Sequence, residues 1–154
     1  MSNSTDRAST DRAAPPPSVT AYGLLGLIPF LAPPLVFWAL PGWSPFASRL
    51  LALYGGLILS FLGGARWGLA NARPAAPAGV ISLSMLPTLV GLALLLLPAD
   101  LRRIQLAGLA VALAAQWVWD ITAADMPRWY PWLRSILSAG AIVGLIAGAA
   151  LATA

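Results

Sequence analysis

Four long stretches of this 154-residue chain carry no charged side chain, and they limit the possible fold more than any other feature. Each contains at least sixteen residues, and a fifth and longer one, residues 13–48, includes the hydrophobic segment 19–40. The four are residues 50–65, 74–99, 104–119 and 135–154. Crossing a hydrocarbon layer of roughly 30 Å takes about 20 apolar residues of α-helix. Nine Arg and five Asp cannot cover a soluble surface, so we expect lipid to surround most of the chain.

The hydrophobic pattern predicts an all-α bundle of five transmembrane helices. Apolar runs of this length do not fit the alternating strands of about ten residues that build a membrane barrel. The polar segment 1–18 cannot bury a core, so we interpret it as a disordered tail that precedes a membrane domain, residues 19–154. The predicted spans are residues 19–40, 46–70, 79–97, 103–122 and 133–152.

The first span contains three prolines, Pro29, Pro33 and Pro34. Each removes a backbone donor, so we expect a kinked or broken helix.

Five crossings place the two termini on opposite sides of the membrane. Six Arg fall on the N-terminal side and three on the other, which favours a cytoplasmic N-terminus. We expect the inner membrane of a bacterium, or the mitochondrial inner membrane if the source is eukaryotic.

Missing residue types exclude several kinds of chemistry. The chain has no Cys, His, Glu or Lys, which leaves no thiol nucleophile, no imidazole base and no usual ligand set for zinc or haem. We therefore expect no metal, no cofactor and no catalytic residue. The sequence pI is about 10.7, but no basic cluster exceeds two residues. Arginines beside lipid headgroups explain the charge better than nucleic acid does.

Polar residues gather at one side of the membrane, because spans two and four end where span five begins. We take the following as candidate binding residues: Arg66, Trp67, Gln116, Asp120, Arg128 and Arg134. The chain has seven Trp, and we assign most of them to the aromatic belt at the membrane interface rather than to a ligand cage.

Arg66 and Asp120 both lie inside hydrophobic spans, each about one turn from a helix end. An arginine in lipid is costly, and a carboxylate at the same depth lowers that cost. We hypothesise a pair between them that bridges spans two and four, with Gln116 one turn away on the same helix face. Two alternatives stay open. Arg134 competes for Asp120, and Arg66 can instead extend alone to the headgroups.

Glycines at intervals of four residues predict close helix packing. Span five carries Gly140, Gly144 and Gly148, and span two carries Gly64 and Gly68. Such stripes let helix backbones approach one another in a membrane. Packing within the chain and packing against a second copy both fit the span-five stripe.

Several sequence blocks resemble a known family. The most specific is Leu-Ser-Phe-Leu-Gly-Gly-Ala-Arg-Trp-Gly at residues 59–68. Further blocks are Tyr-Gly-Leu-Leu-Gly-Leu-Ile-Pro-Phe at 22–30, Trp-Asp at 119–120 and Pro-Arg-Trp-Tyr-Pro-Trp-Leu-Arg at 127–134. The chain resembles the domain of unknown function 3429 family, the transmembrane-protein-69-like membrane proteins, over about residues 21–150. The resemblance implies a small multi-pass membrane protein of bacteria and mitochondria, and it implies no established reaction.

Three functions fit the sequence. The first is a non-enzymatic accessory or assembly subunit that packs against other integral membrane proteins, with membrane lipids around it. The second is a small transporter or hydrophobic-ligand-binding protein, with Arg66, Gln116 and Asp120 lining the route. The third is an enzyme that uses Asp120 or Asp125 as general acid or base and Arg66 as an anion clamp. We favour the first and rank the enzyme last.

Overall fold

The computed structural model describes residues 14–75, 78–122 and 126–152, and every regular element in those ranges is helical. Five helical rods are long and apolar enough to cross a membrane. The chain is therefore an all-α membrane protein with five transmembrane helices, as the sequence predicts. The elements are α2 (Pro17–Leu25), α3 (Ile28–Ala39), η1 (Pro41–Trp43), α4 (Ser44–Asn71), α5 (Ala78–Ser84), α6 (Leu86–Leu95), η2 (Ala99–Leu101), α7 (Arg102–Ile121) and α8 (Tyr130–Leu151).

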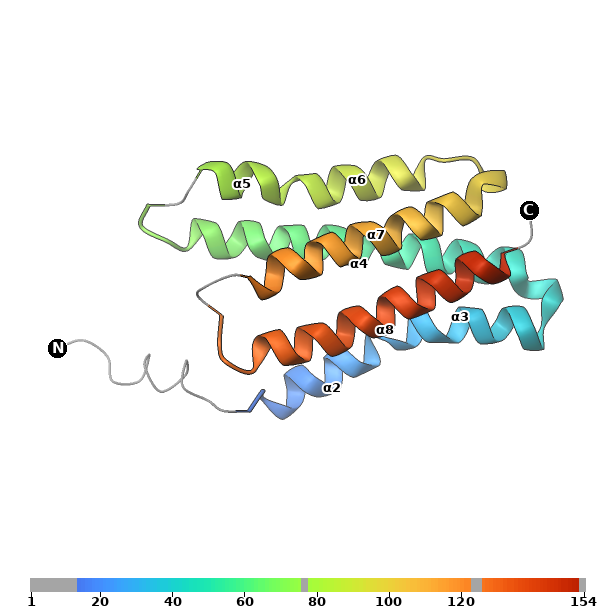
Figure 1. Ribbon diagram of the computed structural model, residues 1–154, viewed down its shortest axis with the longest axis horizontal. Helices are drawn as coiled ribbons and strands as arrows, with labels where there is room; N and C mark the ends of the chain where they lie inside the picture. The colour runs from blue at the N-terminus through green and yellow to red at the C-terminus, as the bar shows by residue number, and fades with distance from the viewer. Residues whose placement is uncertain (1–13, 76–77, 123–125, 153–154) are drawn as a thin grey trace.

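The rods lie side by side along the long axis of the molecule (Figure 1). The α5–α6 rod forms one edge, the α2–α3 rod forms the other, and α4, α7 and α8 lie between them. The central helix is α4, which contacts α3, α5, α6, α7 and α8. Leucines from α4, α7 and α8 fill the core. Those with almost no exposed surface are Leu51, Leu59, Leu106, Leu109, Leu113 and Leu145.

The first rod is broken between α2 and α3, at Gly26 and Leu27. The break lies just before Pro29, which occupies the first turn of α3, whereas Pro33 and Pro34 lie inside α3. The Phe30 amide bonds to the Leu27 carbonyl at 3.0 Å, and this shorter loop leaves the Gly26 carbonyl without its usual helical donor. The Tyr54 hydroxyl on α4 donates to that Gly26 carbonyl at 3.0 Å, so a side chain stabilises the break.

The third rod is also broken, at Met85 between α5 and α6, where the hydrophobic pattern predicts one continuous span. Pro87 lies in the first turn of α6 and supplies no backbone donor to the preceding turn. The Ser84 carbonyl at this break lies against Gly63 of α4, where an added Cβ would come within 2.6 Å of the carbonyl oxygen. Gly63, which belongs to neither glycine stripe, therefore accommodates the break.

The three glycines of α8 lie where that helix meets its neighbours. A Cβ on Gly140 would contact Leu27, one on Gly148 would collide with Leu51, and one on Gly144 would collide with the Phe30 carbonyl. That carbonyl has no helical donor, because the residue four positions later is Pro34. The α8 stripe thus packs within the chain, against α3, α4 and the α2–α3 break.

Gly64 and Gly68 do not pack closely against another helix among the described residues. A Cβ on either would meet no atom within 4 Å among the described residues. The physical reason is the orientation of α4, which turns Gly56 and Gly63 toward the α5–α6 rod instead. Gly64 and Gly68 consequently face outward on the surface of the bundle.

Candidate functional site

Four of the candidate residues come together at one end of the bundle. Arg66 projects from α4, Gln116 and Asp120 from α7, and Arg134 from α8. The end of α4, the end of α7 and the start of α8 lie at this same end of the bundle (Figure 1). We call these four residues the Asp120 cluster.

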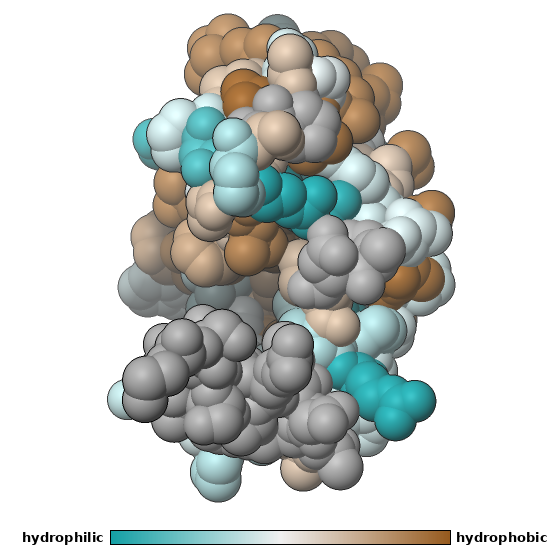
Figure 2. All heavy atoms as spheres, turned by 90° about the vertical axis from the view of Figure 1, so that its left-hand side faces the viewer, coloured by the Kyte–Doolittle hydropathy of each residue, from teal (hydrophilic) through white to brown (hydrophobic). Residues whose placement is uncertain are grey.

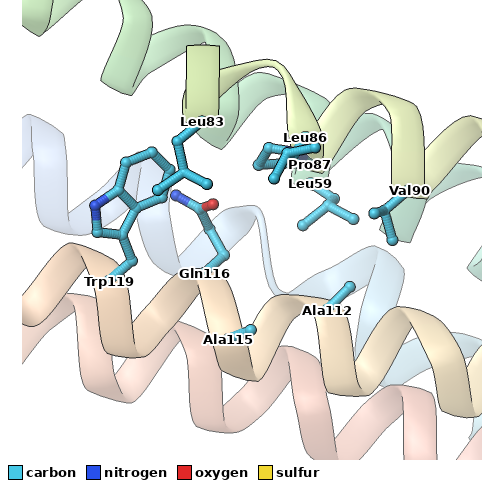
Figure 3. Close-up of a pocket in the computed structure, with 9 residues that line it drawn as sticks. All are labelled: Leu59, Leu83, Leu86, Pro87, Val90, Ala112, Ala115, Gln116 and Trp119. Atoms are coloured by element: carbon cyan, nitrogen blue, oxygen red, sulfur yellow. The ribbon is translucent and has the colours of Figure 1, made fainter. Parts of the chain in front are cut away.

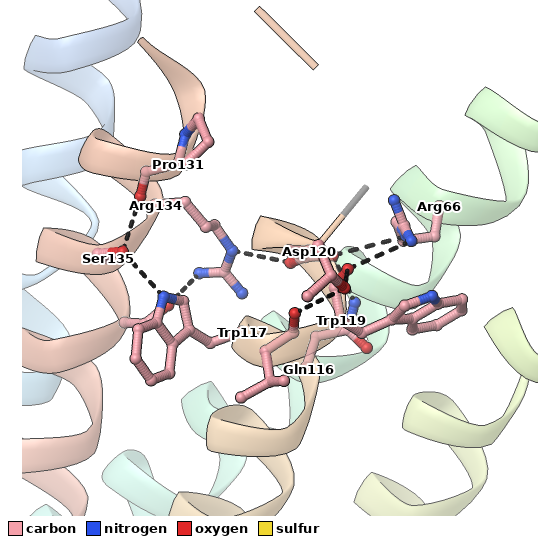
Figure 4. A network of polar contacts seen from close by, with 11 residues as sticks. Arg66, Gln116, Trp117, Trp119, Asp120, Pro131, Arg134 and Ser135 are labelled. Carbon is pink, nitrogen blue, oxygen red and sulfur yellow. Dashed lines mark hydrogen bonds and ion pairs between the residues drawn. The ribbon is translucent and has the colours of Figure 1, made fainter. Parts of the chain in front are cut away.

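Asp120 is the centre of the cluster, and only 1% of its surface is exposed. Arg134 Nε donates to its Oδ2 at 2.8 Å, and Gln116 Nε2 donates to its Oδ1 at 2.9 Å. Gln116 reaches the carboxylate because residues four apart share one face of a helix. Figure 4 shows the carboxylate between the two arginines, with Arg134 on one side and Arg66 on the other.

Arg66 lies farther from Asp120 than Arg134 does. Its Nε is 3.7 Å from Asp120 Oδ1, which is within ion-pair range and too long for a hydrogen bond. The Arg66 guanidinium lies over the Trp119 ring, 4.5 Å from its centroid, and its Nη2 is 3.5 Å from the Trp119 carbonyl. Both partners that the sequence suggested for Asp120 are therefore present, and Arg134 makes the closer contact.

The cluster carries two positive charges and one negative charge. Two of its buried donor atoms, Arg66 Nε and Arg134 Nη2, have no hydrogen-bond partner among the described residues. Buried donors of this kind are costly, and a charged one more so. The arrangement therefore leaves one positive charge in excess and two donors without an acceptor among the described residues.

Ser138 is a member of this network that the sequence analysis missed. Arg134 Nη1 donates to Ser138 Oγ at 2.8 Å, and Ser138 lies one turn after Arg134 on α8. The spacing of four residues places Arg134 and Ser138 on one face of α8, which could have indicated a contact between them. A serine in a membrane helix is common, however, and does not by itself indicate a particular partner. On the neighbouring face, Trp117 Nε1 donates to Ser135 Oγ at 3.0 Å, which ties α7 to α8.

The remaining candidate residues lie outside the cluster. Trp67 is 45% exposed on the surface of α4, and Arg128 is exposed in the turn before α8. Asp125, considered above as a general acid or base, lies outside the described residues. Viewed from this end, hydrophilic side chains form a band across the upper half of the face, with hydrophobic side chains above and beside it (Figure 2). Within the described ranges no three acidic, His or Cys side chains come together to hold a metal ion.

A groove of about 520 Å³ opens beside the cluster, between α2, α4 and α8. We call it the Arg134 groove, because Arg134 and Ser138 form its polar end. Its other walls are almost entirely apolar and include Gly23, Leu27, Phe30, Ile58, Leu62 and Leu137. The volume falls within the range of roughly 300–1,000 Å³ that small-molecule sites occupy.

A smaller groove of about 290 Å³ lies on the other side of α7, beside the α5–α6 break. Figure 3 shows Leu83, Leu86 and Pro87 on one side of it, with Gln116 and Trp119 of α7 on the other. Gln116 lines this groove and also donates to Asp120, so the Asp120 cluster lies between the two grooves.

The geometry predicts unequal effects for the two arginines. We expect Arg66→Gln to reduce the free energy of unfolding by about 1 kcal/mol, since it removes a cation–π contact and a long ion pair. Arg134→Gln removes the hydrogen-bonded partner of a buried carboxylate and should cost at least about 2 kcal/mol more. Unfolding of both variants by SDS in mixed micelles measures this difference. Equal costs would contradict the assignment of Arg134 as the principal partner.

Comparison with known proteins places this chain in a family. Residues 15–150 match the family described as Protein of unknown function (DUF3429). The chain is 34% identical over 140 residues to Transmembrane protein 69 of Xenopus tropicalis, and the match covers 86% of this chain and 53% of the frog protein. It is 32% identical over 129 residues to Transmembrane protein 69 of Mus musculus, covering 80% of this chain and 51% of the mouse protein.

The chain spans about half the length of these two relatives. No solved structure matches it. The family match covers nearly all of the described residues, including both grooves and the Asp120 cluster. The resemblance seen in the sequence is confirmed: this membrane protein belongs to the family of proteins of unknown function DUF3429.

Proposed function

We propose that this protein is a non-enzymatic membrane protein that binds a single-chain anionic amphiphile, such as a long-chain carboxylate, in the Arg134 groove. The observation that carries the proposal is a buried Arg134 side chain beside the groove, with one nitrogen unpaired among the described residues. Its side chain is only 9% exposed, it lines the groove, and its Nη2 has no hydrogen-bond partner among the described residues. A ligand carboxylate would accept that donor and balance the excess positive charge of the cluster.

The order of polar and apolar walls along the groove matches the headgroup and the hydrocarbon chain of such a ligand. Arg134 lies near the start of α8, and the groove continues along that helix to Ala141, a rise of roughly 10 Å. It ends among Phe30 and Tyr54, which lie near the middle of their rods. A headgroup near the membrane surface and a hydrocarbon chain toward the midplane would match this order of polar and apolar walls.

The contacts of Asp120 support a non-enzymatic role. Both of its oxygens accept hydrogen bonds, from Gln116 and from Arg134, and almost none of the residue is exposed. A general base must reach the proton that it removes. A carboxylate held in this way acts as a structural counter-ion that positions the two arginines.

Binding of myristate to the purified chain in mild detergent tests this proposal. We expect saturable binding at least about tenfold tighter than that of the uncharged myristyl alcohol, because the headgroup charge meets Arg134. Leu137→Trp should abolish binding by filling the groove, whereas Ile136→Trp, at the adjacent exposed position, should leave it unchanged. Equal affinity for acid and alcohol, or equal loss in both variants, would overturn the proposal.

A second candidate function is the accessory or assembly subunit, favoured by the outward position of Gly64 and Gly68. Small residues at a helix surface permit close contact with another membrane helix. No described residue of this chain lies against them. A photo-cross-linker at Gly64, compared with one at exposed Val143 on α8, tests the role in native membranes. The absence of any protein adduct specific to Gly64 would count against it.

We further propose a location in the inner membrane with the N-terminus in the cytoplasm, on the basis of the arginine distribution. The end with the Asp120 cluster carries Arg128, and the opposite end carries Trp43. Because the chain has no Cys, single-cysteine variants at these two positions report the orientation directly. In intact cells, an impermeant maleimide should label the position 43 variant and leave the position 128 variant unlabelled.

A further inference from the structure

A second pair of arginines lies at the end of the bundle opposite the Asp120 cluster. Arg49 on α4 and Arg102, the first residue of α7, line one groove of about 620 Å³. We call it the Arg49 groove. Apolar side chains supply most of the remaining wall, among them Phe46, Leu53 and Leu95. The groove therefore has two cationic side chains beside an apolar wall formed by α4 and the end of α6.

The two guanidinium groups face the groove without a carboxylate between them. Because both line the same groove, their positive charges act unfavourably on one another. Among the described residues, no carboxylate lies within 4.0 Å of either one. Asp100 is exposed on η2 and does not line the groove. Two like charges that share a concave wall are stabilised by an anion placed between them.

A buried amide holds Arg102 in place. Arg102 Nη1 donates to Gln105 Oε1, and Gln105 Nε2 donates to the Leu94 carbonyl at the end of α6 at 2.8 Å. Gln105 is only 1% exposed, so both of its hydrogen-bonding groups are used inside an apolar bundle. The link from α6 through Gln105 fixes the guanidinium toward the groove, as a preorganised binding group requires.

Arg103 lies beside this pair and does not line the groove. Arg103, the next residue, is turned away and donates to the Ala152 carbonyl at 2.7 Å. The net positive charge of the groove thus comes from Arg49 and Arg102.

We propose that the Arg49 groove binds the phosphate of an anionic phospholipid and holds part of an acyl chain against Leu53 and Leu95. The planar fork of arginine matches phosphate oxygens bidentately. The groove begins where α7 begins, at the end of its span, which is headgroup depth. This site lies at the other end of the molecule from the Arg134 groove, and it does not depend on the proposed function.

Native mass spectrometry of the intact chain, with phosphatidylglycerol and phosphatidylcholine added separately, tests the site. We expect the wild-type protein to bind phosphatidylglycerol more tightly than phosphatidylcholine. The double variant Arg49→Gln, Arg102→Gln should weaken phosphatidylglycerol binding roughly 10- to 30-fold and leave phosphatidylcholine binding unchanged. Arg128→Gln, an exposed arginine at the other end, is the matched control and should have no effect.

Two further measurements separate the possible outcomes. Restoring charge with Arg49→Lys, Arg102→Lys should recover part of the binding, which distinguishes lost recognition from lost folding. Millimolar inorganic phosphate should not displace phosphatidylglycerol, because the acyl chain contributes to binding. Equal binding of the two lipids by the wild-type protein, an equal loss in Arg128→Gln, or displacement by inorganic phosphate would each overturn the proposal.

Discussion

Replacing Asp120 by Asn is expected to lower the free energy of unfolding by roughly 3–5 kcal/mol. The substitution preserves shape and removes the negative charge between Arg66 and Arg134, which leaves two buried guanidinium groups without a counter-ion. Gln116 also loses a charged acceptor. Reversible unfolding by SDS in mixed micelles measures the change, with helix content followed by circular dichroism.

Asp100→Asn is the matched control for this prediction. Asp100 is exposed on η2, and its substitution should change stability by no more than about 0.5 kcal/mol. A double variant, Asp120→Asn with Arg134→Gln, should recover part of the loss, because it removes one of the unpaired charges. The coupling between the two sites should amount to about 0.5–3 kcal/mol. Strictly additive losses would show that Asp120 and Arg134 act independently.

Gly144→Ala is expected to destabilise the protein by about 1–3 kcal/mol, through overpacking. The added Cβ would collide with the Phe30 carbonyl, a backbone atom that cannot move aside as a flexible side chain can. The same substitution at Gly64 meets no atom within 4 Å. There we expect a gain of up to about 1 kcal/mol, because alanine is the better helix former.

The comparison between the two glycines uses one chemical change at two positions on long membrane helices. Unfolding in mixed micelles again provides the measurement, and the two variants should shift in opposite directions. A stabilising effect of Gly144→Ala would contradict the close approach of α8 to the α2–α3 break. A large loss at Gly64 in the isolated chain would contradict its outward position.

The sequence was sufficient to predict which residues of the Asp120 cluster share one membrane face. It was insufficient to predict the contacts that these residues make with one another. Five crossings require spans two and four to end on the membrane face where span five begins, so Arg66, Asp120 and Arg134 had to share that face. The distances of 2.8 Å for Arg134 and 3.7 Å for Arg66 depend on the rotation of each helix about its own axis. That rotation follows from packing, in which α7 makes its most extensive contact with α8.

The glycines likewise separate what the sequence predicts from what only the packed structure decides. Their spacing predicts that some helix faces approach closely, and the α8 glycines do so within the chain. Spacing alone does not distinguish Gly64 from Gly63, which lie next to each other on α4. Adjacent helix positions point about 100° apart, and only the neighbouring backbone at Ser84 determines which of the two must lack a side chain.

Hydrophobic length, proline positions and the parity of crossings are local properties of the chain, and they determined the membrane class, the number of rods and the end that collects polar residues. The tertiary structure decided which donors remain without partners, where the grooves open and which of the prolines interrupt their helix. These features depend on how helices rotate and approach one another, because an unsatisfied Arg134 nitrogen or a groove wall exists only once several helices are packed together.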